Sequence, residues 1–271
     1  MKVFHFTLPL LICAVMGSCG NAESKRTAAA EATPPASPIA MDTPVKDTAA
    51  RVPVDVLLGK INPAQEEGFV KIAASHTTKQ DIYMRKEAYE AFERMAAEAE
   101  KAGIHLNILS ATRNFYDQKK IWEDKWKGVV RVNGQNLAVS VKDPVQRALA
   151  ILTYSSMPGS SRHHWGTDID LNSLEPAFFN AGEGKKIYEW LLANAPSFGY
   201  CQPYTEKGDA RPEGYNEEKW HWSYVPISKP FLQDYVAQVR NEDIGGFMGS
   251  ETAVEIKVVE KYVKGINGEC K

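Results

Sequence analysis

The chain has 271 residues but no hydrophobic run long enough to cross a bilayer. Its most apolar stretch, residues 3–16, is shorter than the roughly 20 residues that a membrane-spanning helix needs. A segment of this length that follows a positive residue, here Lys2, is typical of a secretion signal. We therefore expect the protein to be exported.

Neither sign of charge is in excess. The chain carries 32 Lys and Arg against 34 Asp and Glu, for a formal net charge of -2. A nucleic-acid-binding protein needs a basic excess or a basic face, so we expect no nucleic-acid partner. The sequence has no internal repeat, and its hydrophobic content of 44% is enough for one well-buried domain.

Cysteine is scarce, with four in the whole chain, and two of them lie near the N-terminus. Cys13 falls inside the apolar stretch. Cys19 follows the small residues Gly17 and Ser18, an order that resembles a bacterial lipoprotein signal. We expect residues 1–18 to be the signal peptide and Cys19 to carry a lipid anchor, on the periplasmic or outer side of a membrane. Ordinary secretion with cleavage near Ser18 is the alternative.

The other two cysteines, Cys201 and Cys270, lie in the second half of the chain. An even pair in an exported protein favours a disulfide, because the compartment is oxidising. Such a bridge would tie the C-terminal segment to the rest of the fold. Two free thiols are the alternative.

The composition divides the chain into four segments. Residues 19–53 are rich in Ala, Thr, Pro and Ser without apolar periodicity, as in a flexible tether. We expect residues 54–240 to form one folded catalytic domain and residues 241–271 to form a C-terminal helical extension.

Apolar periodicity predicts a mixture of helices and short strands. No regular alternation of strand and helix is present, which favours an α+β fold with a small antiparallel sheet flanked by helices. The expected helices span residues 85–102, 114–127, 144–155, 185–194 and 251–264, and the expected strands span residues 105–111, 167–171 and 219–225.

Residues able to hold a metal gather in two segments, 161–170 (SRHHWGTDID) and 218–222 (EKWHW). In the first segment, Asp168 and Asp170 would project from one face of the expected strand, while Ile169 would project from the other. A catalytic zinc site needs three protein ligands, an open water position and a nearby base, and these segments offer the right residue types.

The second segment leaves one question open. Strict strand alternation puts Glu218 and His221 on opposite faces, so they converge only if Glu218 lies in the turn entering the strand or at a bulge. Glu217 is a rival for the same role, and spacing does not choose between the two.

The order Ser-x-His-x-x-Gly-x-x-x-Asp followed by Glu-x-Trp-His resembles the zinc D-alanyl-D-alanine carboxypeptidases of the VanY type. These are related to the D-Ala-D-Ala dipeptidases and to the hedgehog fold. A third segment, residues 110–118 (SATRNFYDQ), resembles the Ser-x-x-Arg-x-x-x-x-Gln element of the family. The resemblance runs from about Leu57 to the C-terminus and implies the DD-peptidase-like fold.

The resemblance also implies a role for each matching residue. The Zn2+ ligands would be His163, Asp170 and His221. Glu218 would be the general base, and Arg113 would stabilise an oxyanion or bind a substrate carboxylate. Ser161 and Gln118 would hydrogen-bond the peptide end. Asp168 stands where many relatives have a small residue, and neither Asp168 nor the adjacent His164 is expected to be a ligand.

The implied activity is the removal of terminal D-alanine from peptidoglycan stem peptides by a metal-activated water. Three alternatives remain: an LD-carboxypeptidase or wall endopeptidase with the same metal site, a non-catalytic zinc module that binds wall peptides, and a structural lipoprotein. We expect a monomer whose partners are the stem peptides and the membrane that holds its anchor.

Overall fold

The computed structural model describes residues 51–271. The expected signal peptide, the lipid anchor at Cys19 and almost all of the expected tether lie outside these residues. No helix within residues 51–271 combines the length and the apolar character needed to span a membrane.

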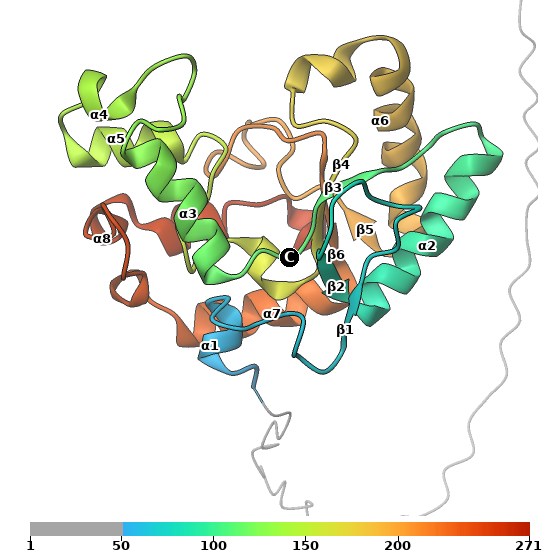
Figure 1. Ribbon diagram of the computed structural model, residues 1–271, viewed down its shortest axis with the longest axis horizontal. Coiled ribbons are helices and arrows are strands. Elements are labelled where there is room, and N and C mark those ends of the chain that lie inside the picture. The colour runs from blue at the N-terminus through green and yellow to red at the C-terminus, as the bar shows by residue number, and fades with distance from the viewer. Residues whose placement is uncertain (1–50) are drawn as a thin grey trace, which may run out of the picture. The chain divides into compact units, whose positions relative to one another are not determined.

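A four-stranded antiparallel sheet forms the centre of the fold (Figure 1). Its strand order is β3-β4-β6-β5, and a separate hairpin-like pair joins β1 to β2. This confirms the expected α+β class with a small antiparallel sheet. The strands are β1 (Phe69–Lys71), β2 (Tyr83–Arg85), β3 (Ile108–Ser110), β4 (Asp168–Leu171), β5 (Tyr200–Cys201) and β6 (His221–Tyr224).

The two central strands have one apolar face and one polar face. β4 and β6 pair so that Ile169 lies opposite Trp222 and Asp170 lies opposite His221. Ile169 and Trp222 are buried in a hydrophobic cluster under the sheet. Because side chains alternate along a strand, Asp170 and His221 are left together on the other face.

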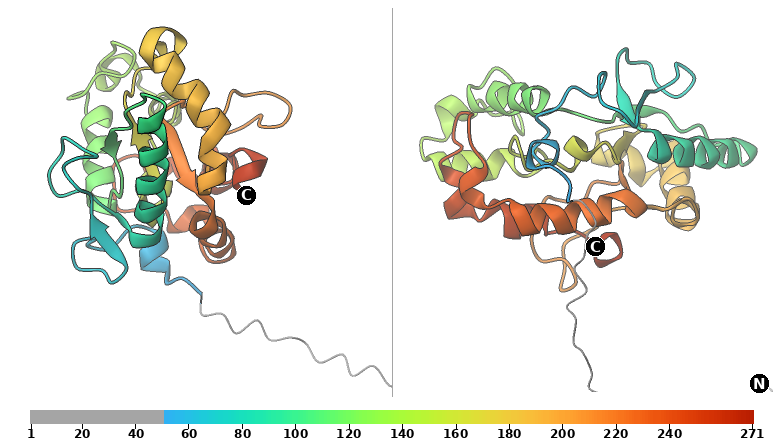
Figure 2. Two further views of the ribbon diagram at one scale, coloured as in Figure 1. Left: turned by 90° about the vertical axis from the view of Figure 1, so that its right-hand side faces the viewer. Right: turned by 90° about the horizontal axis from the view of Figure 1, so that it is seen from below.

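Helices α2 (Lys86–Lys101) and α6 (Gly182–Asn194) cover the apolar face. They lie on the same side of the sheet in Figure 1 and in the left view of Figure 2. The apolar residues of α2 recur at helical spacing, and Ala88, Phe92 and Met95 are fully buried. This face holds the sheet rigid beneath the polar residues.

The remaining helices share a second hydrophobic cluster, which includes Trp122, Trp165 and Tyr235. Residues 241–271 contribute Ile244, Val259 and other side chains to the same cluster, so they form part of the compact unit. The helices of this cluster are α1 (Val54–Leu57), α3 (Phe115–Trp126), α4 (Leu137–Ser140), α5 (Pro144–Ile151), α7 (Val225–Gln238) and α8 (Thr252–Ile256).

One helical assignment from the sequence was wrong, and one long helix was not assigned. The helix expected over residues 251–264 is interrupted, because Lys257 adopts a left-handed conformation (φ 59°) between α8 and a short π-helical turn at Val259–Val263. Helix α7 was not expected at all, because Pro230 lies in its interior, where proline removes a backbone donor.

A glycine turn carries the chain from a 3-10 turn at Arg162–Trp165 into β4. Gly166 has φ 75°, and a Cβ atom there would collide with the Phe69 ring. The turn directs His163 back over the polar face of the sheet.

A disulfide joins Cys201 of β5 to Cys270, and the two residues are 69 positions apart in sequence. Both are buried. The bridge links the C-terminal segment to the edge strand of the central sheet.

We expect reduction of this disulfide to lower the thermal unfolding temperature, because closing a loop of this size contributes about 2–4 kcal/mol of stability. Unfolding of the full chain with and without reductant measures the effect. The double variant Cys201→Ser, Cys270→Ser is the control and should not respond to reductant. An unchanged unfolding temperature after complete reduction of the parent would contradict the prediction.

Candidate active site

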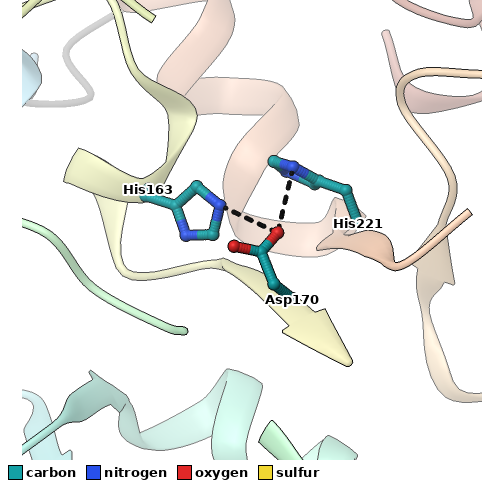
Figure 3. Close-up of side chains that lie close together, drawn as sticks. All are labelled: His163, Asp170 and His221. Atoms are coloured by element: carbon teal, nitrogen blue, oxygen red, sulfur yellow. Dashed lines mark ion pairs between the residues drawn. The ribbon is translucent and has the colours of Figure 1, made fainter. Parts of the chain in front are cut away.

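Three side chains from separate segments converge on one point above the polar face of the sheet (Figure 3). His163 comes from the 3-10 turn, Asp170 from β4 and His221 from the start of β6. Their exposed fractions are 1%, 4% and 3%. One nitrogen or oxygen from each lies within 4.8 Å of the others. The structure therefore brings together the three residues named as ligands from the sequence.

Two of the converging atoms have no hydrogen-bond partner within residues 51–271. They are His163 Nε2 and Asp170 Oδ1, which lie 3.3 Å apart, and both are buried. His221 Nδ1 lies 3.5 Å from the same Asp170 oxygen. Buried polar atoms are normally satisfied, so atoms left open toward a common point indicate a place for a cation.

The far side of each imidazole is held by a hydrogen bond. His163 Nδ1 donates to the Ala111 carbonyl oxygen at 2.7 Å, which leaves Nε2 as the acceptor. His221 Nε2 lies 2.9 Å from Asp168 Oδ2, which leaves Nδ1 facing Asp170. Contacts of this kind are typical of metal-binding histidines, because they fix the tautomer and the ring orientation.

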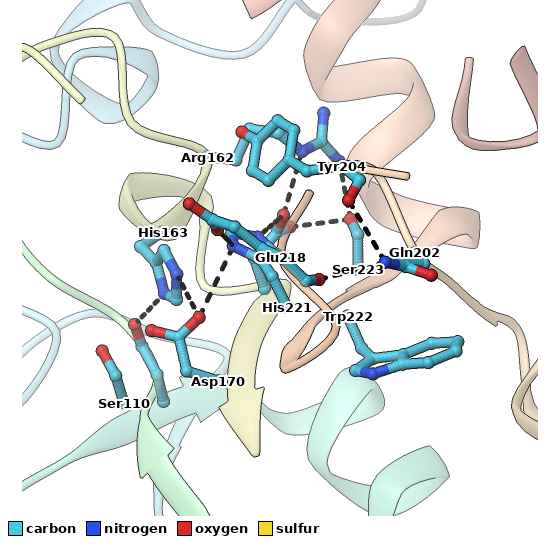
Figure 4. Close-up of polar contacts among 12 residues, drawn as sticks. Ser110, Arg162, His163, Asp170, Gln202, Tyr204, Glu218, His221, Trp222 and Ser223 are labelled. Atoms are coloured by element: carbon cyan, nitrogen blue, oxygen red, sulfur yellow. Dashed lines mark hydrogen bonds and ion pairs between the residues drawn. The ribbon is translucent and has the colours of Figure 1, made fainter. Parts of the chain in front are cut away.

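Asp168 is itself held by hydrogen bonds, two of them from Arg162 and Ser223, which Figure 4 shows near His221. Its carboxylate pairs with the buried Arg162 guanidinium at 2.9 Å and accepts hydrogen bonds from the hydroxyls of Thr167 and Ser223, both at 2.7 Å. Burial opposes ionisation, but the charges of Arg162 and His221 hold the pKa of Asp168 far below its usual value. Asp168 is therefore a fixed anion behind His221.

Glu218 lies in the turn that enters β6, and the His221 amide donates to its carbonyl oxygen at 3.2 Å. This turn brings Glu218 Oε2 to 3.1 Å from His221 Nδ1. Glu217 points elsewhere, toward the Tyr188 hydroxyl and Lys219. Glu218, and not Glu217, is therefore the glutamate that lies beside His221.

Charge at this centre is unevenly balanced. Burial raises the pKa of Glu218 above its ordinary value. Burial alone would lower the pKa of His221, but its hydrogen bonds to Asp168 and Glu218, together with the charge of Asp170, raise it to about 9. A cluster that draws a proton onto a buried imidazole has an excess of negative charge, which a bound cation would neutralise.

Arg113 lies at the edge of the cluster, in the loop between β3 and α3. Its guanidinium donates to Ser110 Oγ at 2.6 Å, to Asp170 Oδ2 at 3.2 Å and to Gln118 Oε1 at 3.1 Å. A capping box formed by Asn114 and Asp117 starts the helix directly after it. Arg113 is thus a half-buried, oriented cation beside Asp170.

Gln118 and Ser161, the two other residues expected to hold the peptide end, differ in that only Gln118 lines the cavity. Gln118 lines the cavity described below and donates to the Ser156 carbonyl oxygen at 2.8 Å. The Ser161 hydroxyl is buried and has no partner within residues 51–271, and Ser161 is not among the cavity-lining residues.

His164 has no nitrogen left for a metal. Its Nδ1 donates to the Arg113 carbonyl oxygen at 2.6 Å, and its Nε2 accepts from the Gly159 amide at 3.0 Å. Burial lowers the pKa of His164 to about 3, so the ring is neutral. It supports the backbone of Arg113 and of the loop before the 3-10 turn.

A cavity of about 550 Å³ opens beside the converging side chains. Its lining includes His163, Asp170, His221, Glu218 and Trp220, together with residues of α3 and of the segment 153–156. Lys125 and Tyr154 also line it, although no sequence motif marked them. Lys125 follows Gln118 by two helical turns, so the spacing along α3 was the one signal for it.

The family model described as "VanY: D-alanyl-D-alanine carboxypeptidase" matches residues 81–227, which include every motif residue named above. The D-alanyl-D-alanine carboxypeptidase of Enterococcus faecalis is 26% identical over 174 residues, which are 64% of this chain and 58% of that protein. YodJ of Bacillus subtilis is 30% identical over 152 residues, 54% of this chain and 48% of that protein. The chain thus spans about half the length of these curated relatives.

Solved structures show more distant similarity. VanYB in complex with D-Alanine-D-Alanine is 21% identical with a TM-score of 0.43, covering 65% of this chain and 87% of that one. The LdcB LD-carboxypeptidase is 21% identical with a TM-score of 0.46, covering 73% and 79%. A VanY mutant in complex with Zn(II) is 20% identical with a TM-score of 0.41, covering 67% and 93%.

The family match extends over more than half of the chain and confirms the resemblance drawn from the three sequence motifs. The chain belongs to the VanY family of D-alanyl-D-alanine carboxypeptidases.

Proposed function

We propose that this protein is a zinc-dependent D-alanyl-D-alanine carboxypeptidase that removes terminal D-alanine from peptidoglycan stem peptides. The observation that carries the proposal is the convergence of His163 Nε2, Asp170 Oδ1 and His221 Nδ1 beside Glu218 at a cavity wall. Membership of the VanY family supports the reaction class.

The donor set fits zinc. Two imidazole nitrogens and one carboxylate oxygen match a catalytic zinc site, whereas calcium and magnesium prefer oxygen donors alone. Zinc bound here would lower the pKa of a water to about 7 and polarise the substrate carbonyl. His163 donates a hydrogen bond to the Ala111 carbonyl oxygen and His221 donates one to the Asp168 carboxylate, and these bonds keep both rings in the orientation that such a site needs.

Glu218 is suited to move the proton. It is buried beside the proposed metal ligands. Burial raises its pKa toward neutral pH, and a carboxyl group whose pKa lies nearer the working pH can both accept and return a proton. In the proposed reaction it takes a proton from the attacking water and delivers it to the leaving amine of D-alanine.

Arg113 is suited to stabilise the negative charge that develops on the carbonyl oxygen of the substrate. Its guanidinium offers a planar fork of donors, and Ser110 and Gln118 hold it beside Asp170. A fixed cation at the cavity wall would stabilise the carbonyl oxygen as it becomes negative, without reorganising during the reaction.

Stem peptides lie outside the cytoplasm, so the protein must be exported to reach them. We propose that residues 1–18 direct export and that a lipid at Cys19 anchors the protein to a membrane, with the segment before Val54 as a tether. This part rests on the sequence pattern alone.

The test of the function is cleavage of stem peptides by the purified, zinc-loaded full chain, scored by mass spectrometry with and without a chelator. We expect chelator-sensitive loss of one alanine from a pentapeptide that ends in D-Ala-D-Ala. Loss from a tetrapeptide alone would make the protein an LD-carboxypeptidase. Absence of cleavage in both peptides, with zinc bound, would contradict the proposal.

Replacing Glu218 should separate binding from catalysis. We expect Glu218→Gln to lower kcat by about 10²–10⁴-fold, because an amide cannot accept the proton, while zinc content stays unchanged. Glu217→Gln is the matched control, since Glu217 faces Tyr188 and Lys219. Parent-like turnover in the Glu218 variant would show that another group is the base.

Asp168 should act through His221. We expect Asp168→Asn to weaken zinc affinity by about 10–100-fold, because the anion that orients the imidazole is lost. Competition with a chromophoric chelator measures the affinity, and thermal unfolding of the metal-free protein reports on folding. Thr167→Val removes a different hydrogen bond to Asp168 and should cause a smaller loss. An unchanged affinity in a folded Asp168→Asn protein would refute this role.

A further inference from the structure

One lysine on helix α3 differs from its neighbours. Lys119, Lys120 and Lys127 each pair with an acidic side chain of the same helix, either Glu123 or Asp124. Lys125 forms no ion pair with any residue in 51–271, and its Nζ donates to the Ser155 hydroxyl instead. It is also the one lysine of these four that lines the cavity.

This position is unfavourable for a cation in the free protein. Lys125 is half-buried, and a partly desolvated ammonium held by a neutral hydroxyl loses hydration without a directly paired opposite charge. Burial, followed by the nearby charge of Arg113, lowers the pKa of Lys125, although the charge of Glu218 acts in the opposite direction. A carboxylate bound close to the Lys125 Nζ would favour the charged form of the lysine.

Acidic and basic residues both line the cavity. Asp170 and Glu218 belong to the proposed metal centre, where a divalent ion would offset their charge. The lining also includes Lys125 from α3 and Arg131 from the loop after it, whereas its other acidic residue, Glu175, is exposed. With the metal bound, Lys125 and Arg131 would leave this part of the lining positive, and it would attract the anionic part of a substrate.

Lys125 is also connected to the catalytic arginine. Arg113 contacts Gln118, Gln118 donates to the Ser156 carbonyl oxygen, and the neighbouring Ser155 hydroxyl accepts from Lys125. The two cations therefore lie along one continuous wall. A peptide whose scissile carbonyl faces Arg113 would place another part of its length against Lys125.

We propose that Lys125 binds a carboxylate of the peptide substrate and thereby sets substrate specificity. The inference rests on the proposed carboxypeptidase function. Two parts of a stem peptide carry this chemistry, the C-terminal α-carboxylate and the side-chain carboxylate of a diaminopimelate residue. A flexible ammonium binds either one as a point charge without a demand for planar geometry.

The test compares the zinc-loaded full chain with its Lys125→Met variant, which keeps the alkyl stem and loses the charge. The substrates are a pentapeptide acid, its C-terminal carboxamide, and a matched pair with L-Lys or diaminopimelate as the third residue. We expect Lys125→Met to raise KM for its carboxylate-bearing substrate by about 10–100-fold with little change in kcat, as for loss of a charged hydrogen bond.

The substrate pairs identify the carboxylate. If Lys125 binds the terminal group, the parent prefers the acid to the carboxamide and the variant loses this preference. If it binds the side chain, the variant instead loses a preference for diaminopimelate over L-Lys. Lys125→Arg keeps the charge and should retain the preference of the parent. Lys120→Met, on the exposed side of α3, should match the parent on every substrate.

Other outcomes would overturn the inference. Unchanged KM values for all four substrates, or an equal rise in KM for all four, would show that Lys125 does not bind a substrate carboxylate. Thermal unfolding and zinc content identify a folding defect, in which case Lys125→Gln takes the place of the methionine variant. A parent protein that cleaves no peptide would count against the proposed function, whereas an active parent with unaltered specificity in the variant would reject the role of Lys125 alone.

Discussion

The antiparallel register between β4 and β6 is the constraint on which the site depends. It places Asp170 opposite His221 on one face and Ile169 opposite Trp222 on the other. A slip by one residue would turn the apolar pair out of the core, at a loss of about 1.5–3 kcal/mol for each large side chain exposed. Packing under the sheet therefore fixes the distance between Asp170 and His221, two of the three proposed metal ligands above it.

The orientation of the His221 imidazole depends on a buried ion pair and not on apolar packing. The Arg162–Asp168 pair is fully buried, and such pairs contribute little to net stability because both ions lose hydration. What the pair does contribute is a fixed contact with His221 Nε2, which leaves Nδ1 free to face the proposed metal. Charged residues of both signs continue into the cavity lining, which includes Asp170 and Glu218 as well as Lys125 and Arg131.

Much of this arrangement could be predicted from the sequence, because it depends on local patterns. Alternation along β4 placed Ile169 on the opposite face from Asp170, and the three motifs identified the family. What could not be predicted depends on tertiary contacts. The contact between Asp168 and His221 joins two strands, and the choice of Glu218 over Glu217 depends on the turn before β6. The contact between Lys125 and Ser155 joins α3 to a segment 30 residues further along the chain, so the local sequence of α3 does not predict it.

The most direct test of the central claim is a crystal structure of the zinc-loaded protein with anomalous data at the zinc edge. We expect one peak within about 2.0–2.2 Å of His163 Nε2, Asp170 Oδ1 and His221 Nδ1, the usual range for zinc with these donors. Glu218 should lie beside the ion without binding it. A peak elsewhere, or a metal bound through His221 Nε2 with Asp168 displaced, would contradict the account.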